Sequence, residues 1–190
     1  MLDIEKLALP HGKIVSLTIK KGEILFIHGP NGSGKSLLLK SLASLLPCAY
    51  QKFSFHQKDL KKWDYQEYRS KVMYTAPLPH TPMDQTVEEF MRSPLELEIF
   101  QKQSFSAPVD PAAYLKEYGL SGMKLSFLSS GQKQLLSLLR LVTLNCEILL
   151  LDETMAHLDA EKIRSMEKLV LQWKEKNDGT LIIVNHVQDF

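Results

Sequence analysis

Eight consecutive residues near the N-terminus have the types and spacing of a phosphate-binding loop. Gly29, Gly34, Lys35 and Ser36 satisfy the pattern G-x-x-x-x-G-K-[ST] within GPNGSGKS. Glycines let backbone N–H groups turn inward around phosphates, which a Cβ would obstruct. Lys35 would then reach the β- and γ-phosphates of a nucleotide, and the Ser36 hydroxyl would coordinate Mg²⁺. The residues expected around the phosphates are Gly29, Pro30, Asn31, Gly32, Ser33, Gly34, Lys35, Ser36 and Leu37.

The residues on either side of this loop predict the elements that position it. An apolar run at 24–27 has the character of a strand, and residues 37–46 form a helix-like run. A strand that feeds a glycine-rich loop into a helix is the context that the pattern needs, and the helix adds the positive end of its dipole. This context favours a nucleotide loop over the alternative, an ordinary glycine turn.

A second group of candidate residues follows an apolar run at 148–151, which ends in Asp152 and Glu153. Such a run predicts a buried parallel strand that delivers its acids at the carboxyl end, where open α/β sheets place their ligands. Asp152 is the candidate Mg²⁺ ligand, directly or through water, and Glu153 the candidate general base for in-line attack of water on the γ-phosphate. Taken alone, the pattern fits a structural strand equally well. Its order after the glycine loop favours catalysis.

The third motif is LSSGQ at 128–132, a short step before that strand. Ser129 is a good helix N-cap, and the residues that follow supply an apolar helical face. That face consists of Leu135, Leu136, Leu138, Leu139 and Val142. With the three motifs in this order, the chain resembles the nucleotide-binding domains of ABC transporters from about residue 2 to residue 186. The family's signature reads LSGGQ, so Ser130 replaces the first of its two glycines.

The resemblance implies roles for further residues. Ser129, Ser130, Gly131 and Gln132 would contact the γ-phosphate of ATP held by the opposite protomer of a head-to-tail dimer. Residues 156–159 resemble the D-loop of the family.

One histidine completes the catalytic set that the resemblance implies, which is Lys35, Glu153 and His186. His186 follows the apolar run 181–184 and matches the switch histidine that contacts the γ-phosphate. A single histidine at a strand end is more often structural, so this assignment depends on order and resemblance. The implied metal ligands are Ser36 and Asp152.

The chain departs from the family pattern at the strand between the two ATP motifs. A glutamine that senses Mg²⁺ and couples the ATPase to its membrane partner is expected near VMYTAP, where Ala76 or Pro77 stands instead. Gln85 substitutes only if the loop is rearranged, since a loop glutamine is usually just polar. In the family a proline usually follows the catalytic glutamate, whereas Thr154 follows Glu153 here.

A second departure concerns the adenine. The aromatic residue that stacks on adenine in the family is expected before Val15, but this stretch offers only Leu9, Pro10 and His11. His11 is therefore the candidate for stacking.

Length and composition predict one catalytic domain, because 190 residues with 44% hydrophobic and 24% charged residues can bury a full core. Strands are expected at 14–19 and 24–28, joined by a tight turn, and an amphipathic helix at 160–176. Prolines break residues 78–127 into short helices, including 86–91 and 112–118, and this resembles the helical lobe with which ABC domains grip transmembrane helices. The expected fold is an α/β P-loop NTPase core with a mixed or parallel sheet, an N-terminal antiparallel β element, and the lobe at 78–127 within a single domain of 1–190.

Charge and cysteine content exclude several classes. A net charge of +1 gives no footprint for nucleic acid, and the cluster Lys58, Lys61 and Lys62 is expected to be a solvated helix face. Cys48 and Cys146 are too few for a disulfide framework or a zinc site. The N-terminus does not resemble a signal peptide, and the apolar runs are too short to span a membrane. We expect a cytoplasmic protein, peripheral on the cytoplasmic face of the inner or plasma membrane, whose membrane contact comes only through a partner.

The function that the resemblance implies is the ATP-binding subunit of an ABC transporter. It would bind Mg·ATP, form a homodimer or heterodimer of cassettes, and hydrolyse ATP to drive transport through a transmembrane permease subunit. Short bacterial subunits of export systems, such as those of iron or haem traffic, look most similar. Two alternatives remain: a soluble ABC ATPase of DNA repair or translation, and a degenerate cassette that binds ATP without efficient hydrolysis. The family normally continues beyond His186, so one sheet edge is expected to be less covered.

Overall fold

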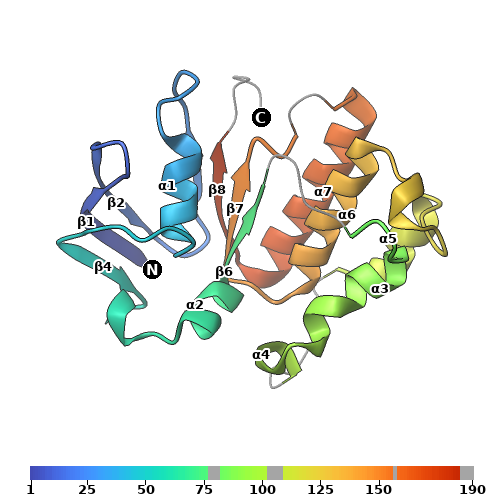
Figure 1. The fold of residues 1–190 in the computed structure, drawn as a ribbon, viewed down its shortest axis with the longest axis horizontal. Helices are drawn as coiled ribbons and strands as arrows, with labels where there is room; N and C mark the ends of the chain where they lie inside the picture. Colours follow the sequence, from blue (N-terminus) through green and yellow to red (C-terminus); the bar gives the residue numbers. More distant parts are fainter. Residues whose placement is uncertain (77–81, 102–108, 156–157, 185–190) are drawn as a thin grey trace.

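The computed structural model describes residues 1–76, 82–101, 109–155 and 158–184, whose strands form two four-stranded sheets (Figure 1). The first sheet is antiparallel with the order β2-β1-β4-β5, and the second is parallel with the order β3-β8-β7-β6. The antiparallel strands are β1 Leu2–Ala8, β2 Ile14–Ile19, β4 Lys52–Phe55 and β5 Lys58–Asp59. The parallel strands are β3 Ile24–Ile27, β6 Val72–Thr75, β7 Ile148–Asp152 and β8 Thr180–Val184. These sheets confirm the predicted α/β fold with its N-terminal antiparallel element.

Helices cover both faces of the parallel sheet. In Figure 1, α1 lies between the two sheets, and α6 and α7 lie on the opposite face of the parallel sheet. The helices are α1 Lys35–Leu42, α2 Tyr65–Lys71, α3 Val87–Arg92, α4 Glu98–Gln101, α5 Pro111–Glu117, α6 Ser130–Thr143 and α7 Ala160–Asn177. Short 3₁₀ helices span Leu60–Lys62, Ser93–Glu96 and Leu125–Phe127.

The two central strands, β7 and β8, separate two apolar cores. Side chains alternate along a strand, so Ile148 and Leu150 pack with α1 and the antiparallel sheet, while Leu149 and Leu151 pack with α6 and α7. All five residues of β7 are buried. This explains the unbroken apolar run in the sequence, since a strand buried on both faces does not alternate with polar residues.

The chain passes from one sheet to the other between β2 and β3. Both strands were predicted, but the second ends at Ile27, and the two belong to different sheets. The turn needs Gly22, whose φ of 76° lies in the left-handed region. A Cβ on Gly22 would lie 2.6 Å from the carboxylate oxygen Oδ1 of Asp178, so the α7–β8 connection packs directly against this turn.

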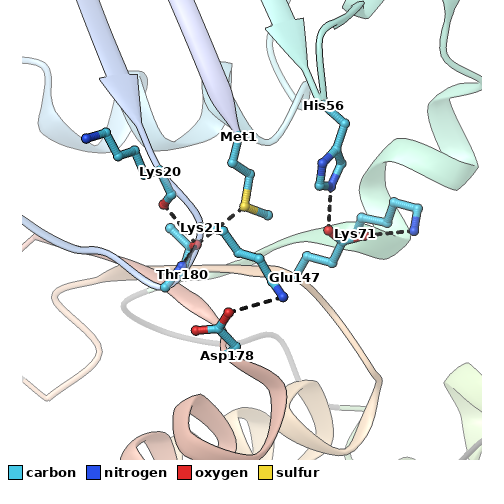
Figure 2. Close-up of polar contacts among 9 residues, drawn as sticks. Met1, Lys20, Lys21, His56, Lys71, Glu147, Asp178 and Thr180 are labelled. Atoms are coloured by element: carbon cyan, nitrogen blue, oxygen red, sulfur yellow. Dashed lines mark hydrogen bonds and ion pairs between the residues drawn. The ribbon is translucent and has the colours of Figure 1, made fainter.

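Polar contacts join the two sheets below the strands (Figure 2). The hydroxyl of Thr180, the first residue of β8, accepts a hydrogen bond from the Gly22 N–H at 3.0 Å and donates to the carbonyl oxygen of Lys20 at 3.4 Å. Lys21 pairs with Asp178 at 3.1 Å. The β2–β3 turn is thus bonded to both ends of the α7–β8 connection.

Glu147 makes the second group of contacts in Figure 2. Its carboxylate accepts hydrogen bonds from Nε2 of His56 at 2.6 Å and from Nζ of Lys71 at 2.8 Å. Burial by itself would raise the pKa of Glu147, but the bonds from Lys71 and His56 outweigh it and hold the pKa below its usual value. A single carboxylate therefore bonds the β4–β5 turn, α2 and the entry to β7 together.

The predicted helices of the region at 78–127 are present where the structure describes it. Thr86 caps α3 in a reciprocal capping box with Glu89, and Asp110 caps α5 ahead of Pro111. Gly119, with a φ of 62°, follows α5 as expected for a helix stop. Residues 77–81 and 102–108 lie outside the described residues, and the limits of the lobe stay a prediction.

Two local predictions are wrong. The helix expected at 37–46 ends at Leu42, because Ser44 adopts a left-handed φ of 55° and the Leu45 N–H turns back to the carbonyl oxygen of Lys40 at 2.9 Å. Lys58 does not lie on a helix face. It belongs to strand β5, and its ammonium lies 4.3 Å from the centre of the Trp63 ring.

The remaining expectations concern exposure. Among the described residues, β3 and β6 are the outer strands of the parallel sheet, and Ile24 and Phe26 on β3 are 41% and 39% exposed. Cys48 and Cys146 are free, and burial raises the pKa of the Cys146 thiol to about 12. Across the part of the chain that the structure describes, no helix has the length and apolar character needed to span a membrane.

Candidate nucleotide-binding site

The glycine-rich loop connects β3 to α1, as the sequence predicts. Gly32 and Gly34 have φ angles of 75° and 97°, which lie in the left-handed region. Nζ of Lys35 donates hydrogen bonds to the carbonyl oxygens of Gly29 at 2.7 Å and Pro30 at 3.1 Å. An ammonium has three N–H donors, so these two bonds fix the side chain across the loop and leave one donor for an anion.

A cavity of about 330 Å³ opens over this loop. It is lined by Asn31, Gly32, Ser33, Gly34, Lys35, Ser36, Leu37 and Glu153. The backbone N–H groups at the start of α1 face no acidic residue in the first turn of the helix. A helix N-terminus of this kind stabilises negative charge, so the cavity fits the phosphates of a nucleotide.

Asp152 lies beside the loop at the end of β7. Its side chain is fully buried, and its two oxygens each accept one hydroxyl hydrogen bond. Oδ1 accepts from the hydroxyl of Ser36 at 2.9 Å, and Oδ2 accepts from the hydroxyl of Tyr74 at 2.7 Å. The converging oxygens of Ser36 and Asp152 are hard ligands, and Mg²⁺ typically takes one or two carboxylates together with substrate phosphates. The residues present therefore fit a magnesium ion that is bound with a nucleotide.

Sequence reasoning missed Tyr74. It lies on β6, paired in parallel register with Leu150 of β7, so its side chain points to the same face of the sheet as Asp152. Burial, followed by the hydrogen bond to Asp152, raises the pKa of the Tyr74 phenol well above its usual value. The sequence shows an aromatic residue two places before Ala76, but its contact with Asp152 can be recognised only once β6 and β7 are known to be neighbours.

Glu153 faces the same cavity as the loop and has a left-handed φ of 49°. Its N–H donates to the carbonyl oxygen of Val184 on β8 at 3.0 Å. The next residue, Thr154, is buried, and its hydroxyl oxygen lies 2.5 Å from that of Thr75 on β6. The strained backbone at Glu153 is therefore held from both neighbouring strands, which aims the carboxylate at the phosphate cavity.

The signature residues lie at the start of α6. Ser129 caps the helix, and Gln132 returns a bond to the Ser129 N–H at 2.9 Å, which completes a capping box. A Cβ on Gly131 would lie 2.7 Å from Cδ of Lys162, so α7 packs closely here. Ser130 is exposed at the first helical position, which explains why a serine is tolerated there. None of these residues is among those that line the cavity over the loop.

His11 lies against the loop. Its Nε2 is 3.2 Å from the carbonyl oxygen of Ser33, and Nζ of Lys13 donates to the same oxygen at 3.0 Å. A Cβ on Gly34 would lie 2.4 Å from the His11 ring, which shows how tightly the ring covers the loop. Lys13 was not predicted from the sequence.

The structure thus brings together the loop, Asp152 and Glu153. Gln85 is not among the residues that line the cavity, and its backbone carbonyl bonds the N–H of Leu125 at 3.0 Å instead. Asp159, at the end of the predicted D-loop, caps α7. The proposed switch residue His186, Pro77, and positions 156 and 157 of the D-loop lie outside the described residues.

Comparison with known proteins decides the family. The sequence profile of the ABC transporter family matches residues 13–156, which is most of the chain. The chain belongs to the ABC transporter family. The manganese transport system ATP-binding protein MntB of Bacillus subtilis is 31% identical over 185 residues, covering 90% of this chain and 69% of that relative. The cytochrome c biogenesis ATP-binding export protein CcmA of Shewanella sp. is 31% identical over 176 residues, covering 90% and 77%.

Solved structures show the same fold for this ABC protein. A dimeric ATP-binding cassette, MJ0796, bound to ADP and phosphate, superimposes with a TM-score of 0.79 at 22% identity, covering 98% of this chain and 88% of that one. A putative ABC transporter ATP-binding protein from Pyrococcus furiosus gives 0.72 at 20% identity, covering 98% and 92%. The chain is accordingly an ABC ATP-binding protein with the ABC ATPase fold.

Proposed function

We propose that this ABC protein binds Mg·ATP, pairs head-to-tail with a second cassette, and hydrolyses ATP to drive transport through a transmembrane subunit. The observation that supports this most directly is the position of Asp152 and Glu153. Asp152 ends the buried strand β7 and is bonded to Ser36, and Glu153 follows it and lines the phosphate cavity. A metal ligand and a candidate base therefore lie beside one nucleotide loop.

In this mechanism the chain's own groups hold the nucleotide and activate water. Loop N–H groups and Lys35 bind the phosphates, while Ser36 and Asp152 hold Mg²⁺, which neutralises charge on the phosphate oxygens when bound. Glu153 accepts a proton from a water molecule while the oxygen of that water forms a bond to the γ-phosphorus. The bond from that phosphorus to the β–γ bridging oxygen breaks, which releases ADP and phosphate.

The second cassette supplies what the cavity lacks. The described cavity lining contains none of Ser129, Ser130, Gly131 or Gln132, although these residues form an exposed, capped helix start. A helix start of this kind suits a phosphate on another protomer. We therefore infer that the signature acts on the nucleotide of a partner cassette, in a homodimer or a heterodimer, and that His186 contacts the γ-phosphate.

The membrane subunit is proposed to dock in a groove of about 390 Å³ between the end of α1, β6 and the helical region. The guanidinium of Arg140 lies 3.8 Å from the centre of the Phe90 ring, and the buried Nε atom of Arg140 has no hydrogen-bond partner among the described residues. Arg69 also lines the groove, together with apolar residues that include Leu45 and Leu97. The positive charge of the two arginines beside apolar walls favours one occupant, a short helix of the transmembrane subunit that carries an acidic residue among apolar ones.

The proposed place of action is the cytoplasmic face of the membrane. The curated relatives include one of a manganese transport system and one of cytochrome c biogenesis export. The family likeness therefore does not identify the cargo, and we propose that the membrane subunit selects it. An export role is our proposal within this range.

The deciding experiment compares ATP turnover of the wild type with that of Glu153→Gln. Loss of a measurable wild-type rate in the variant would support hydrolysis with Glu153 as base. Equal and negligible rates would favour the degenerate cassette, an interpretation that Ala76 or Pro77 in the place of the expected glutamine also supports.

The transporter role is tested separately. The tagged chain is extracted gently with detergent from its native cells, and the proteins that co-purify are identified by mass spectrometry. Recovery of a multi-span membrane protein would support a transporter, whereas its repeated absence would favour a soluble ABC ATPase.

A further inference from the structure

Strand β6 ends in two hydroxyl-bearing residues that both bond the turn carrying the acids. Tyr74 donates to Oδ2 of Asp152 at 2.7 Å, and the hydroxyl oxygen of Thr75 lies 2.5 Å from that of Thr154. Neighbouring residues of a strand point to opposite faces of the sheet. The two contacts therefore hold the Asp152–Glu153–Thr154 turn from both faces at once.

The two donors to Asp152 differ in what else they must do. A fully buried carboxylate requires hydrogen-bond donors, and here Ser36 serves Oδ1 and Tyr74 serves Oδ2. Ser36 belongs to the nucleotide loop, and its hydroxyl oxygen is the proposed metal ligand. Tyr74 lies on β6, outside the loop, and is not a proposed metal ligand. Its bond to Oδ2 fixes the rotation of the carboxylate so that Oδ1 continues to face Ser36.

We propose that Tyr74 is a positioning residue of the nucleotide site, which orients the Asp152 carboxylate toward Ser36 and so toward Mg²⁺. The inference rests on the proposed function, because it requires that Asp152 and Ser36 bind Mg²⁺ together with ATP. Groups that orient a metal ligand typically change metal affinity or activity by 10–100-fold when they are removed.

The test measures how strongly Mg²⁺ and nucleotide assist each other's binding. A fluorescent, non-hydrolysable ATP analogue is titrated into the protein, once with excess Mg²⁺ and once with EDTA. The dissociation constant in EDTA divided by that in Mg²⁺ measures how much the metal strengthens nucleotide binding, and the measurement needs no turnover. We expect Tyr74→Phe to lower this ratio about tenfold and to leave the affinity in EDTA unchanged.

A matched control is Tyr114→Phe. This phenol, on α5, also donates one hydrogen bond to a side-chain oxygen, that of Gln172 at 2.8 Å, but Gln172 is not a candidate metal ligand. An equal change of the ratio in Tyr74→Phe and Tyr114→Phe would overturn the inference. In an Asp152→Asn background, Tyr74→Phe should have no further effect on the ratio, because the residue acts through that carboxylate.

The outcomes separate this inference from the proposed function. A wild type whose affinity does not respond to Mg²⁺ would overturn both, whereas a responsive wild type with an unaffected Tyr74→Phe ratio overturns the inference alone. If Tyr74→Phe no longer binds the analogue in EDTA, the substitution has disturbed the fold, and fluorotyrosine is placed at position 74 instead. This change alters the strength of the donor but keeps the ring, so an unchanged ratio then contradicts the inference.

Discussion

Nε2 of His11 lies 3.2 Å from the carbonyl oxygen of Ser33, so a residue of the antiparallel sheet region lies directly on the nucleotide loop. The sequence suggested His11 as the group that stacks on adenine. The structure places its ring at Gly34, next to the phosphate cavity. Two roles are therefore open to test: a stacking surface for the base, or a hydrogen-bonded support of the loop.

We predict that His11→Ala raises the dissociation constant for ATP by about three- to tenfold, which corresponds to the loss of one aromatic contact. His11→Phe keeps a ring but loses the bond to Ser33. Restored affinity in His11→Phe identifies stacking as the cause, while equal weakening in both variants identifies loop support. An affinity that stays at the wild-type value in His11→Ala would contradict both roles. The measurement is a fluorescence titration with a labelled ATP analogue.

The paired hydroxyls of Thr75 and Thr154 give a second prediction. Thr75→Val leaves the buried Thr154 hydroxyl without its partner, which costs about 1–3 kcal/mol of unfolding free energy. Thr154→Val should cost less, because the Thr75 hydroxyl keeps its long bond to the carbonyl oxygen of Leu150 at 3.5 Å. The double variant should cost less than the sum, since both polar groups are then gone. Urea denaturation provides the free energies. Thr143→Val is the control, because its hydroxyl bonds locally to the Arg140 carbonyl oxygen, and it should add to Thr75→Val without coupling.

Catalysis should fall in the same variants. Glu153 has a φ of 49°, a conformation that persists only when neighbours hold it. Loss of the Thr75–Thr154 bond should therefore lower ATP turnover more than it lowers ATP affinity. A fall in affinity alone would contradict this view of the turn.

The motifs and the central strands could be predicted from the sequence because their signals are local. The pattern from Gly29 to Ser36 and the apolar run before Asp152 each specify both an element and its place, and the structure puts them side by side. Capping signals were equally direct at Ser129 and Asp110.

The contacts that could not be predicted join residues far apart in the chain. Tyr74 and Asp152 are 78 positions apart, and only the pairing of β6 with β7 brings them together. The end of α1 was missed for a different reason. The apolar residues after Leu42 continue the helical pattern, but the backbone turns left-handed at Ser44, a residue with little intrinsic preference for that conformation.

Glu147 provides a pH-dependent prediction. Its pKa is lower in the folded protein than its ordinary value of 4.5, because the bonds from Lys71 and His56 exceed the effect of burial. A lowered folded-state pKa means that the stabilisation is complete above pH 4.5 and is lost as the pH falls below it through the folded-state pKa. We expect Glu147→Gln to cost about 1 kcal/mol at neutral pH. The difference in unfolding free energy between the wild type and Glu147→Gln should then shrink in acid.

Chemical denaturation at a series of pH values measures this difference. The control is Glu5→Gln, since Glu5 is exposed and its ion pair with Lys52 is longer, at 3.4 Å. A gap between wild type and Glu147→Gln that stays constant from neutral to acid pH would rule out the assigned role of the carboxylate.

The groove at Arg140 gives the last prediction. Arg140→Met keeps an unbranched side chain but removes the guanidinium that lies on the Phe90 ring, so an acidic residue of the membrane subunit would lose its partner. We expect purified Arg140→Met to rebind stripped native membrane vesicles at least about tenfold more weakly than the wild type, as for loss of a buried charge pair. ATP affinity should stay unchanged. Arg92→Met, a variant of a neighbouring arginine outside this groove, is the control, and equal rebinding of all three proteins would exclude Arg140 from the docking contact.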